Sequence, residues 1–205
     1  VKAKYFVNAT GPGVDTIRKM DQKEVENFII PSSGSHLLLR QKLCAENKGL
    51  LIPKTKDGRV IFILPWEQGT LVGTTDRACS LDDSLCTEEE KVYLLEHIQA
   101  YFSYPFTKDD ILATWSGIRP LVRDIKNKDT KSLSREHLIH RSDSGLWTIA
   151  GGKWTSYRRM AEDLLDTLSE TEGLEMGECK TKRLLLIGDR KSTRLNSSHR
   201  CISYA

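Results

Sequence analysis

Short hydrophobic and β-branched runs follow one another along most of this chain. Glycine, proline and Lys-Asp-Gly clusters separate them, which is typical of strands joined by turns. The runs between residues 35 and 74 predict an antiparallel sheet, and the last two runs predict a hairpin around residues 142–145. The predicted strands are residues 4–9, 35–39, 50–52, 60–64, 70–74, 111–115, 134–140 and 146–149.

Three segments predict helices. Residues 14–20 follow a Thr-Gly-Pro-Gly turn and form a short helix. Thr87 and Glu90 have the spacing of a capping box, which opens a helix that runs to about residue 102. After residue 156, apolar side chains recur at the spacing of one buried helical face. They are Tyr157, Met160, Ala161, Leu164, Leu165 and Leu168.

Strands near both ends of the chain, with a mixed sheet between them, predict an α/β fold (α+β mixed) in which one domain interrupts another. We expect residues 1–24 and 146–172 to form one α/β unit and residues 25–145 to form an inserted β-rich domain. Residues 173–188 resemble a polar linker followed by the start of another strand.

Composition describes a globular protein, with 39% hydrophobic and 29% charged residues among 205. The sequence contains no stretch of about 20 apolar residues, so no membrane-spanning helix is predicted. Cys44, Cys79, Cys86 and Cys179 form no Cys-x-x-Cys pair and have no histidine cluster beside them. We therefore expect neither a disulfide framework nor a metal site.

Both ends of the chain have unusual features. The chain begins at Val1 without a start methionine or targeting segment and almost at once enters the predicted strand at residues 4–9, so we expect a fragment whose beginning is missing. Residues 189–205 begin Asp-Arg-Lys-Ser-Thr-Arg-Leu-Asn-Ser-Ser-His and resemble a translated sequencing adapter, so we exclude them from the fold. Without them the formal net charge falls from +3 to 0. The charge then predicts no nucleic-acid partner.

The strand-to-helix turn after residue 150 carries the most chemistry. Gly151 and Gly152 let a backbone come close to a flat or anionic group. Thr155 and Ser156 are natural N-caps, and a helix start favours negative charge. Lys153 adds a positive charge, so the turn could hold a phosphate or the negative charge of a reduced flavin. The alternative is a threonine-capped glycine turn with Lys153 in solvent.

The first predicted strand ends with small residues. Ala9, Thr10 and Gly11 would allow a cofactor to lie against the backbone. An ordinary strand-loop-helix turn is the alternative.

Two further runs could act on a substrate. His36 opens an apolar strand, and its near-neutral pKa would let it take a hydroxyl proton, although a structural histidine is the alternative. Arg119 lies in a Gly-Ile-Arg-Pro run and suits a fork onto phosphate, or else pairs with a surface carboxylate. Thr75 and Asp76 could hydrogen-bond near an active site or form a capped turn.

Five runs in order resemble the FAD-dependent glycerol-3-phosphate dehydrogenases, most like the mitochondrial type, over roughly residues 1–175. The Gly-Gly-Lys run is the most specific of them. The runs are residues 7–12 (Val-Asn-Ala-Thr-Gly-Pro), 33–36 (Ser-Gly-Ser-His), 73–76 (Gly-Thr-Thr-Asp), 115–121 (Trp-Ser-Gly-Ile-Arg-Pro-Leu) and 151–161, with Gly-Gly-Lys and later Tyr157, Arg158 and Ala161.

This resemblance implies part of an FAD/NAD(P)-binding, Rossmann-like domain interrupted by a β-sheet substrate (cap) domain. It implies FAD as cofactor and oxidation of sn-glycerol 3-phosphate to dihydroxyacetone phosphate, with electrons passed to a quinone. It also implies a mitochondrial, inner-membrane location for the full-length protein and is compatible with membrane association of that protein.

The resemblance implies a role for each candidate residue. His36 would remove the proton of the C2 hydroxyl, Arg119 would orient the substrate, and Lys153 would stabilise the charge of reduced flavin. Thr75 and Asp76 would join His36 and Arg119 in binding substrate. The expected flavin-binding residues are Ala9, Thr10, Gly11, Gly151, Gly152, Lys153 and Thr155.

The sequence departs from the family pattern at two places that bear on FAD binding. Gly13 stands where the family usually has an aromatic residue, and no Gly-x-Gly-x-x-Gly run occurs to hold the FAD pyrophosphate. We therefore expect residues 1–188 alone not to retain FAD. The alternative functions are an amine-oxidizing flavoenzyme, which shares the Gly-Ile-Arg-Pro run, and a non-enzymatic truncated product that acts as a β-rich interaction module.

Overall fold

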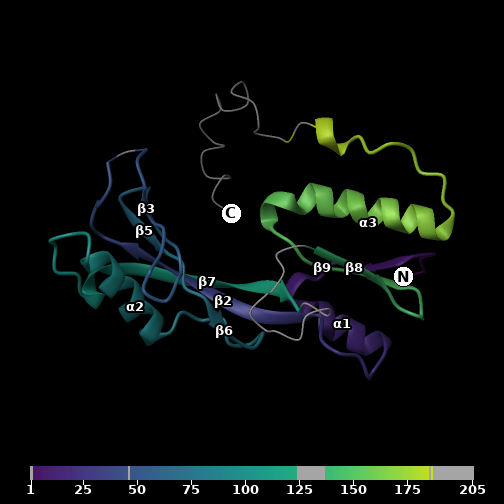
Figure 1. The fold of residues 1–205 in the computed structure, drawn as a ribbon, viewed down its shortest axis with the longest axis horizontal. Coiled ribbons are helices and arrows are strands. Elements are labelled where there is room, and N and C mark those ends of the chain that lie inside the picture. Colours follow the sequence, from purple (N-terminus) through teal and green to yellow (C-terminus); the bar gives the residue numbers. More distant parts are fainter. Residues whose placement is uncertain (1, 46, 124–136, 185, 187–205) are drawn as a thin grey trace. The chain divides into compact units, whose positions relative to one another are not determined.

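A computed structural model describes residues 2–45, 47–123, 137–184 and 186 of the chain (Figure 1). The chain divides into two compact units, Val1–Lys153 and Trp154–Ala205. The first unit contains two β-sheets and two α-helices, and the second contains one α-helix, among the described residues.

The first sheet joins strands from the two ends of the first unit. Its order is β1 (Phe6–Asn8), β9 (Leu146–Gly151) and β8 (His137–Arg141). β1 and β9 are parallel, with Asn8 opposite Thr148, and β8 and β9 form the predicted antiparallel hairpin. Residues 134–136 of the predicted hairpin lie outside the described residues. The parallel pair brings together two turns that are far apart in the sequence.

The second sheet is antiparallel throughout its described pairings, as predicted. Its strand order is β3-β4-β5-β2-β6, and β7 pairs with the other edge of β2. The strands are β2 (Ile29–Leu39), β3 (Leu50–Ile52), β4 (Ile61–Trp66), β5 (Gly69–Gly73), β6 (Arg77–Ala78) and β7 (Ile111–Val122).

β2 and β7 are longer than the sequence predicted. β2 begins at Ile29 rather than residue 35, and β7 continues to Val122 rather than ending at residue 115. The added segments contain serine, glycine and proline, which lack an apolar strand pattern. A continuous antiparallel ladder from Ile29–Val122 onward holds them in the sheet. Pairing with a distant strand therefore outweighs the weak local preference.

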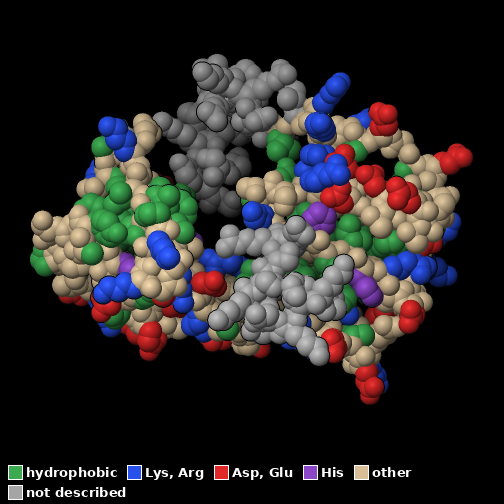
Figure 2. All heavy atoms as spheres, in the orientation of Figure 1, with side chains coloured by type: hydrophobic (Ala, Val, Ile, Leu, Met, Phe, Trp, Pro, Cys, Tyr) green, Lys and Arg blue, Asp and Glu red, His purple; other side chains and the backbone are tan. Residues whose placement is uncertain are grey.

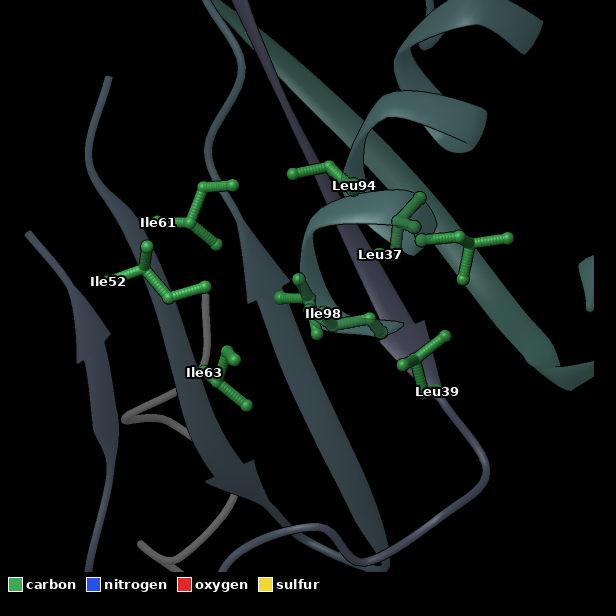
Figure 3. Close-up of a cluster of buried hydrophobic side chains, with 9 residues drawn as sticks. Leu37, Leu39, Ile52, Ile61, Ile63, Leu94 and Ile98 are labelled. Carbon is green, nitrogen blue, oxygen red and sulfur yellow. The ribbon is translucent and has the colours of Figure 1, made fainter. Parts of the chain in front are cut away.

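Helix α2 (Glu88–Gln99) covers one face of the second sheet. Figure 3 shows leucine and isoleucine side chains from the helix and the strands pointing toward one another. This core is made of Leu37, Leu39, Ile52, Ile61, Ile63, Val72, Leu94, Leu95 and Ile98.

The predicted capping box at the start of α2 is confirmed. The Thr87 hydroxyl accepts the Glu90 N–H at 3.3 Å, and the Glu90 carboxylate accepts the Thr87 N–H at 3.0 Å. The helix ends at Gln99, about one turn earlier than predicted.

No helix among the described residues of the first unit covers the opposite face of the second sheet. Its exposed apolar side chains include Leu51, Phe62, Leu64 and Trp115. Figure 2 shows hydrophobic side chains gathered over the part of the molecule that carries β3 and β5. Because strand residues alternate between faces, His36 lies on this open face while Leu37 points into the core.

Helix α1 (Val14–Asp21) follows the 3-10 turn Gly11–Gly13. Val14 packs with Phe28, Ile29, Val122 and Ala150, so this cluster joins the two sheets of the first unit. The buried Asp15 carboxylate accepts the N–H groups of Phe28 and Ile29. The entry into β2 is therefore fixed by both apolar packing and hydrogen bonds.

The second unit contains helix α3 (Tyr157–Glu172), which ends at Gly173 with a left-handed φ of 63°. Leu164 and Leu168 are buried as predicted, but Tyr157 and Leu165 are about half exposed. Residues Thr181–Arg183 form a 3-10 turn, so the described part of 173–188 contains no strand start. In the described part of the chain, no helix has both the length and the apolar character to cross a membrane.

Candidate active site

His36 is fixed on the open face of the second sheet by two neighbouring strands. It lies opposite Gly73 of β5 and opposite Trp115 of β7. A Cβ at Gly73 would overlap the His36 imidazole, so only glycine leaves room for the ring. The His36 and Trp115 rings stack, with centroids 5.9 Å apart and planes 14° apart.

This environment favours the neutral form of His36. Burial lowers the pKa of the imidazole below its ordinary value of 6.5, and the positive charge of Arg119 lowers this pKa further. A neutral imidazole can accept a proton at neutral pH. His36 therefore has the protonation state that a general base requires.

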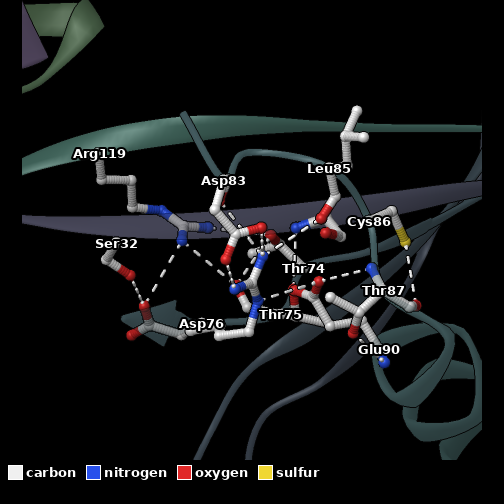
Figure 4. Close-up of polar contacts among 12 residues, drawn as sticks. Ser32, Thr74, Thr75, Asp76, Asp83, Leu85, Cys86, Thr87, Glu90 and Arg119 are labelled. Carbon is white, nitrogen blue, oxygen red and sulfur yellow. Dashed lines mark hydrogen bonds and ion pairs between the residues drawn. The ribbon is translucent and has the colours of Figure 1, made fainter. Parts of the chain in front are cut away.

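Arg119 of β7 lies opposite Ser32, four cross-strand pairs away from the His36–Trp115 pair. A Cβ at Gly34 of β2 would overlap the Arg119 guanidinium, so this glycine provides the space in which the guanidinium lies. Nη1 donates to the Thr75 carbonyl oxygen at 3.2 Å, and Nη2 donates to the Thr74 hydroxyl at 2.9 Å (Figure 4). A guanidinium has five N–H donors, so others remain to bind an anion.

The loop after β5 supplies the partners of Arg119. The Asp76 carboxylate lies 3.6 Å from Arg119 Nη1 and accepts a hydrogen bond from Ser32. Thr75 is buried, and its hydroxyl accepts the Ser35 N–H at 2.9 Å and donates to Glu90. Thr75 thus affects the site through its carbonyl oxygen and its neighbours rather than through an exposed hydroxyl.

The two glycine turns lie at one edge of the first sheet, because β1 and β9 are parallel. Gly11 has a φ of +58°, and a Cβ there would meet no atom within 4 Å. Gly151 and Gly152 have φ values of 78° and 74°, a region that favours glycine. The 3-10 turn Gly11–Gly13 also contacts β7 and β9. Among the described residues, no atom fills the space that a Cβ at Gly11 would occupy.

Asn8 organises the turn after β1. Its buried side-chain amide donates to the Val14 carbonyl oxygen at 2.9 Å, and its Oδ1 accepts the Thr10 hydroxyl at 2.7 Å. Ala9 and Thr10 are exposed beside it. The sequence signal for this role was an asparagine two residues before Thr10 of the Thr-Gly turn, where side-chain amides hydrogen-bond nearby backbone.

The predicted helix cap at Thr155 is wrong. Trp154–Ser156 forms a 3-10 turn, and α3 begins only at Tyr157. Ser156 takes the N-cap position but makes no side-chain capping bond, and Thr155 is exposed in the second unit. Lys153 is exposed at the end of the first unit. The flavin-binding role of these residues stays a prediction.

The structure groups His36, Arg119, Thr75 and Asp76 together and places Ala9–Gly11 with Gly151–Gly152. The sequence analysis missed Gly34, Gly73, Thr74 and Trp115 as parts of the first group. Glycines inside apolar strand patterns are a usable signal, since they often mark a close approach. Among the described residues no group of three or more His, Cys, Asp or Glu could hold a metal ion, and the four described cysteines are free.

Comparison with known proteins identifies the family. Residues 1–158 match the family described as FAD dependent oxidoreductase. The chain belongs to this family. The mitochondrial glycerol-3-phosphate dehydrogenase of Mesocricetus auratus is 47% identical over 191 residues, which cover 92% of this chain and 26% of that protein. The chain thus spans about a quarter of the length of this curated relative.

Solved structures agree with this family. The glycerol-3-phosphate dehydrogenase of Bacillus halodurans, complexed with FAD, has a TM-score of 0.78 and 33% identity, covering 95% of this chain and 37% of that chain. Iminodiacetate oxidase of Chelativorans sp. BNC1 has a TM-score of 0.54 and 15% identity, covering 89% and 46%. The second likeness concerns the fold alone.

The first sheet of this FAD dependent oxidoreductase fits part of the cofactor. Ligands of open α/β sheets bind beyond the carboxyl ends of the strands, where both glycine turns lie. The uncovered backbone at Gly11 could accept a flat group. The residues that would hold FAD there are Ala9, Thr10, Gly11, Gly151, Gly152 and Lys153.

Proposed function

We propose that the protein carrying this chain oxidises sn-glycerol 3-phosphate to dihydroxyacetone phosphate with FAD. The observation that carries the proposal is a neutral His36 beside a fixed Arg119 on one open sheet face. The identity of 47% to a protein named mitochondrial glycerol-3-phosphate dehydrogenase supports the substrate.

His36 and Arg119 have different roles toward the substrate: His36 removes a proton and Arg119 binds an oxygen or the phosphate. Bound FAD would supply the hydride acceptor for oxidation at C2. His36 takes the proton of the C2 hydroxyl, because its imidazole is neutral and held by Trp115. Arg119 holds the substrate phosphate or the reacting oxygen with N–H groups that its loop partners leave available. Asp76 and Thr75 keep the guanidinium in place, and Asp76 borders the substrate.

The glycine turns and Lys153 serve the cofactor. Gly11, Gly151 and Gly152 let the flavin approach the backbone. Lys153 offers a positive charge to the negative charge of the reduced flavin.

We infer that electrons pass on to a quinone and that the protein works in mitochondria, associated with the inner membrane. The names of the curated relatives support the mitochondrial location. The quinone and the inner membrane rest on the family resemblance.

The test is anaerobic mixing of the full-length, FAD-loaded protein with sn-glycerol 3-phosphate. We expect the visible flavin absorption to bleach and dihydroxyacetone phosphate to form, while sn-glycerol 1-phosphate and glycine leave the flavin oxidised. Bleaching by an amine substrate without bleaching by sn-glycerol 3-phosphate would contradict the proposal and favour an amine oxidase.

A further inference from the structure

Glu90 is a buried carboxylate at the start of α2, with only 6% of the residue exposed. A capping-box glutamate needs only the backbone N–H of the N-cap residue, which Glu90 accepts from Thr87. Glu90 has further partners: the Thr75 hydroxyl donates to it, and Arg77 Nε lies 3.4 Å away. Acidic side chains are rarely buried unless they are paired in this way. Glu90 therefore does more than cap the helix.

Thr75 connects Glu90 with the guanidinium of Arg119 (Figure 4) and with the backbone of the residue before His36. Its hydroxyl donates to Glu90 and accepts the N–H of Ser35, the residue before His36. Its own N–H donates to the Ser35 carbonyl oxygen at 3.3 Å. Its carbonyl oxygen accepts Arg119 Nη1 at 3.2 Å. One residue thus joins the helix start, the strand of His36 and the guanidinium of Arg119.

We propose that Glu90 is a positioning residue for the oxidation of sn-glycerol 3-phosphate, acting through Thr75 on Arg119 and His36. The inference rests on the proposed function of the site. A hydroxyl has a single hydrogen to donate, and Glu90 is the acceptor that orients it. The lone pairs of the Thr75 hydroxyl are then directed at the Ser35 N–H, and the Thr75 carbonyl stays under Arg119.

The charge state of Glu90 suits this role. Burial raises the pKa of its carboxyl, but hydrogen bonds from Thr75 and Thr87 and the charge of Arg77 lower the pKa more, so its pKa is below the usual value. An ionised carboxylate can only accept hydrogen bonds. In the Thr75–Glu90 hydrogen bond the Thr75 hydroxyl is therefore always the donor.

Loss of Glu90 should change the pKa of His36, whereas loss of the helix cap alone should not. The charge of Arg119 is one cause of the lowered pKa of His36, after burial. If the 74–76 loop loosens and Arg119 moves away, the pKa of His36 rises. The acid limb of the pH profile of kcat/KM then moves to higher pH.

The experiment compares Glu90→Ala, Glu90→Gln and Thr75→Val in the full-length, FAD-loaded enzyme. The matched control is Thr87→Ala, which removes the other half of the capping box but leaves Glu90 bonded to Thr75. For Glu90→Ala we expect kcat/KM to fall about 10- to 100-fold, with the acid limb shifted to higher pH. Glu90→Gln keeps a carbonyl acceptor and should lose less.

Thr87→Ala should keep kcat/KM within about twofold and leave the acid limb in place. The double variant of Glu90→Ala and Thr75→Val should lose no more than the worse single variant, because both break one connection. Wild-type values in Glu90→Ala would overturn the proposal, as would an equal loss in Thr87→Ala. If Glu90→Ala does not bind FAD, Glu90→Gln and Thr75→Val decide by the same measures.

Failure of the proposed function gives a different result. If sn-glycerol 3-phosphate does not reduce the flavin of the wild-type holoenzyme, the proposed function is wrong. The pKa of His36, followed by NMR in the substrate-free holoenzyme, then tests the positioning role alone. A higher His36 pKa in Glu90→Ala and Thr75→Val, but not in Thr87→Ala, supports it, and an unchanged pKa overturns it.

Discussion

The guanidinium of Arg119 lies over the backbone of Gly34, in the space that a Cβ at residue 34 would fill. Gly34 is buried in the middle of β2, so neither the strand nor its β7 partner can move aside at low cost. The hydrogen bonds of Arg119 to Thr74 and Thr75 therefore depend on a glycine, which has no Cβ, at residue 34.

Replacing Gly34 by alanine should displace Arg119 and lower kcat/KM for sn-glycerol 3-phosphate by about 100-fold, because a misplacement near 1 Å costs this much. Steady-state kinetics of the FAD-loaded enzyme measures the loss. Gly177→Ala is the control, since a Cβ at Gly177 meets no atom within 4 Å. Wild-type kinetics in Gly34→Ala would show that Arg119 need not hold this position.

Removal of the His36 imidazole should slow turnover. For His36→Asn we expect kcat to fall about 10²- to 10⁴-fold, the range that general acid–base catalysis supplies. His97→Asn is the control, because His97 lies on α2 and contacts the Tyr93 carbonyl oxygen instead of the open sheet face. Equal kinetics of the two variants would remove His36 from the mechanism.

The pH dependence of activity and stability follows from the lowered pKa of His36. The base must be neutral, so kcat/KM should hold as pH falls to 6.5 and decline only below this ordinary value. Because the unfolded chain binds the proton more readily than the folded one, stability also decreases as pH falls below about 6.5. Arg119→Met should move the acid limb of kcat/KM to higher pH. An acid limb above pH 6.5 in the wild type would contradict the proposed role.

Lys153 should set the reduction potential of the bound flavin. Lys153→Met removes a positive charge that favours the reduced, anionic form, so the potential should fall by about 30 mV, equivalent to about 1.4 kcal/mol for two electrons. Turnover should fall with it. Lys108→Met is the control, since Lys108 pairs with Glu88 at the surface of α2. If Lys153→Met changes neither potential nor turnover, the cofactor-binding role of the Gly-Gly-Lys turn is wrong.

The core beneath α2 should determine the local stability of the second sheet. Ile98 is fully buried, so Ile98→Ala should destabilise α2 by about 2–5 kcal/mol through lost burial and a cavity. Val92→Ala on the same helix should change stability by about 0.5 kcal/mol or less, because Val92 is 39% exposed. Hydrogen exchange of the α2 amides in the full-length protein measures both. A similar exchange rate in the two variants would contradict this core.

Much of the fold was predictable because its signals are local. Short apolar and β-branched runs between turn residues predicted β3, β4, β5 and the β8–β9 hairpin, and Thr87 and Glu90 predicted the start of α2. The five motif runs also named His36, Arg119, Thr75 and Asp76, which the structure brings to one place. Burial pattern and turn chemistry are properties of neighbouring residues, so sequence reasoning can detect them.

Tertiary structure alone decided how these residues act on one another. The full length of β2 and β7 depends on a ladder whose paired residues are 72 to 93 positions apart in the sequence, which no local pattern encodes. The space for Arg119 over Gly34, the stacking of Trp115 on His36 and the second role of Glu90 arise only when three strands and a helix are packed. The sequence by itself indicated most of the elements and named the candidate site residues. The packing decided their distances, their protonation and their partners, because hydrogen bonds and desolvation depend on groups that meet only in the folded chain.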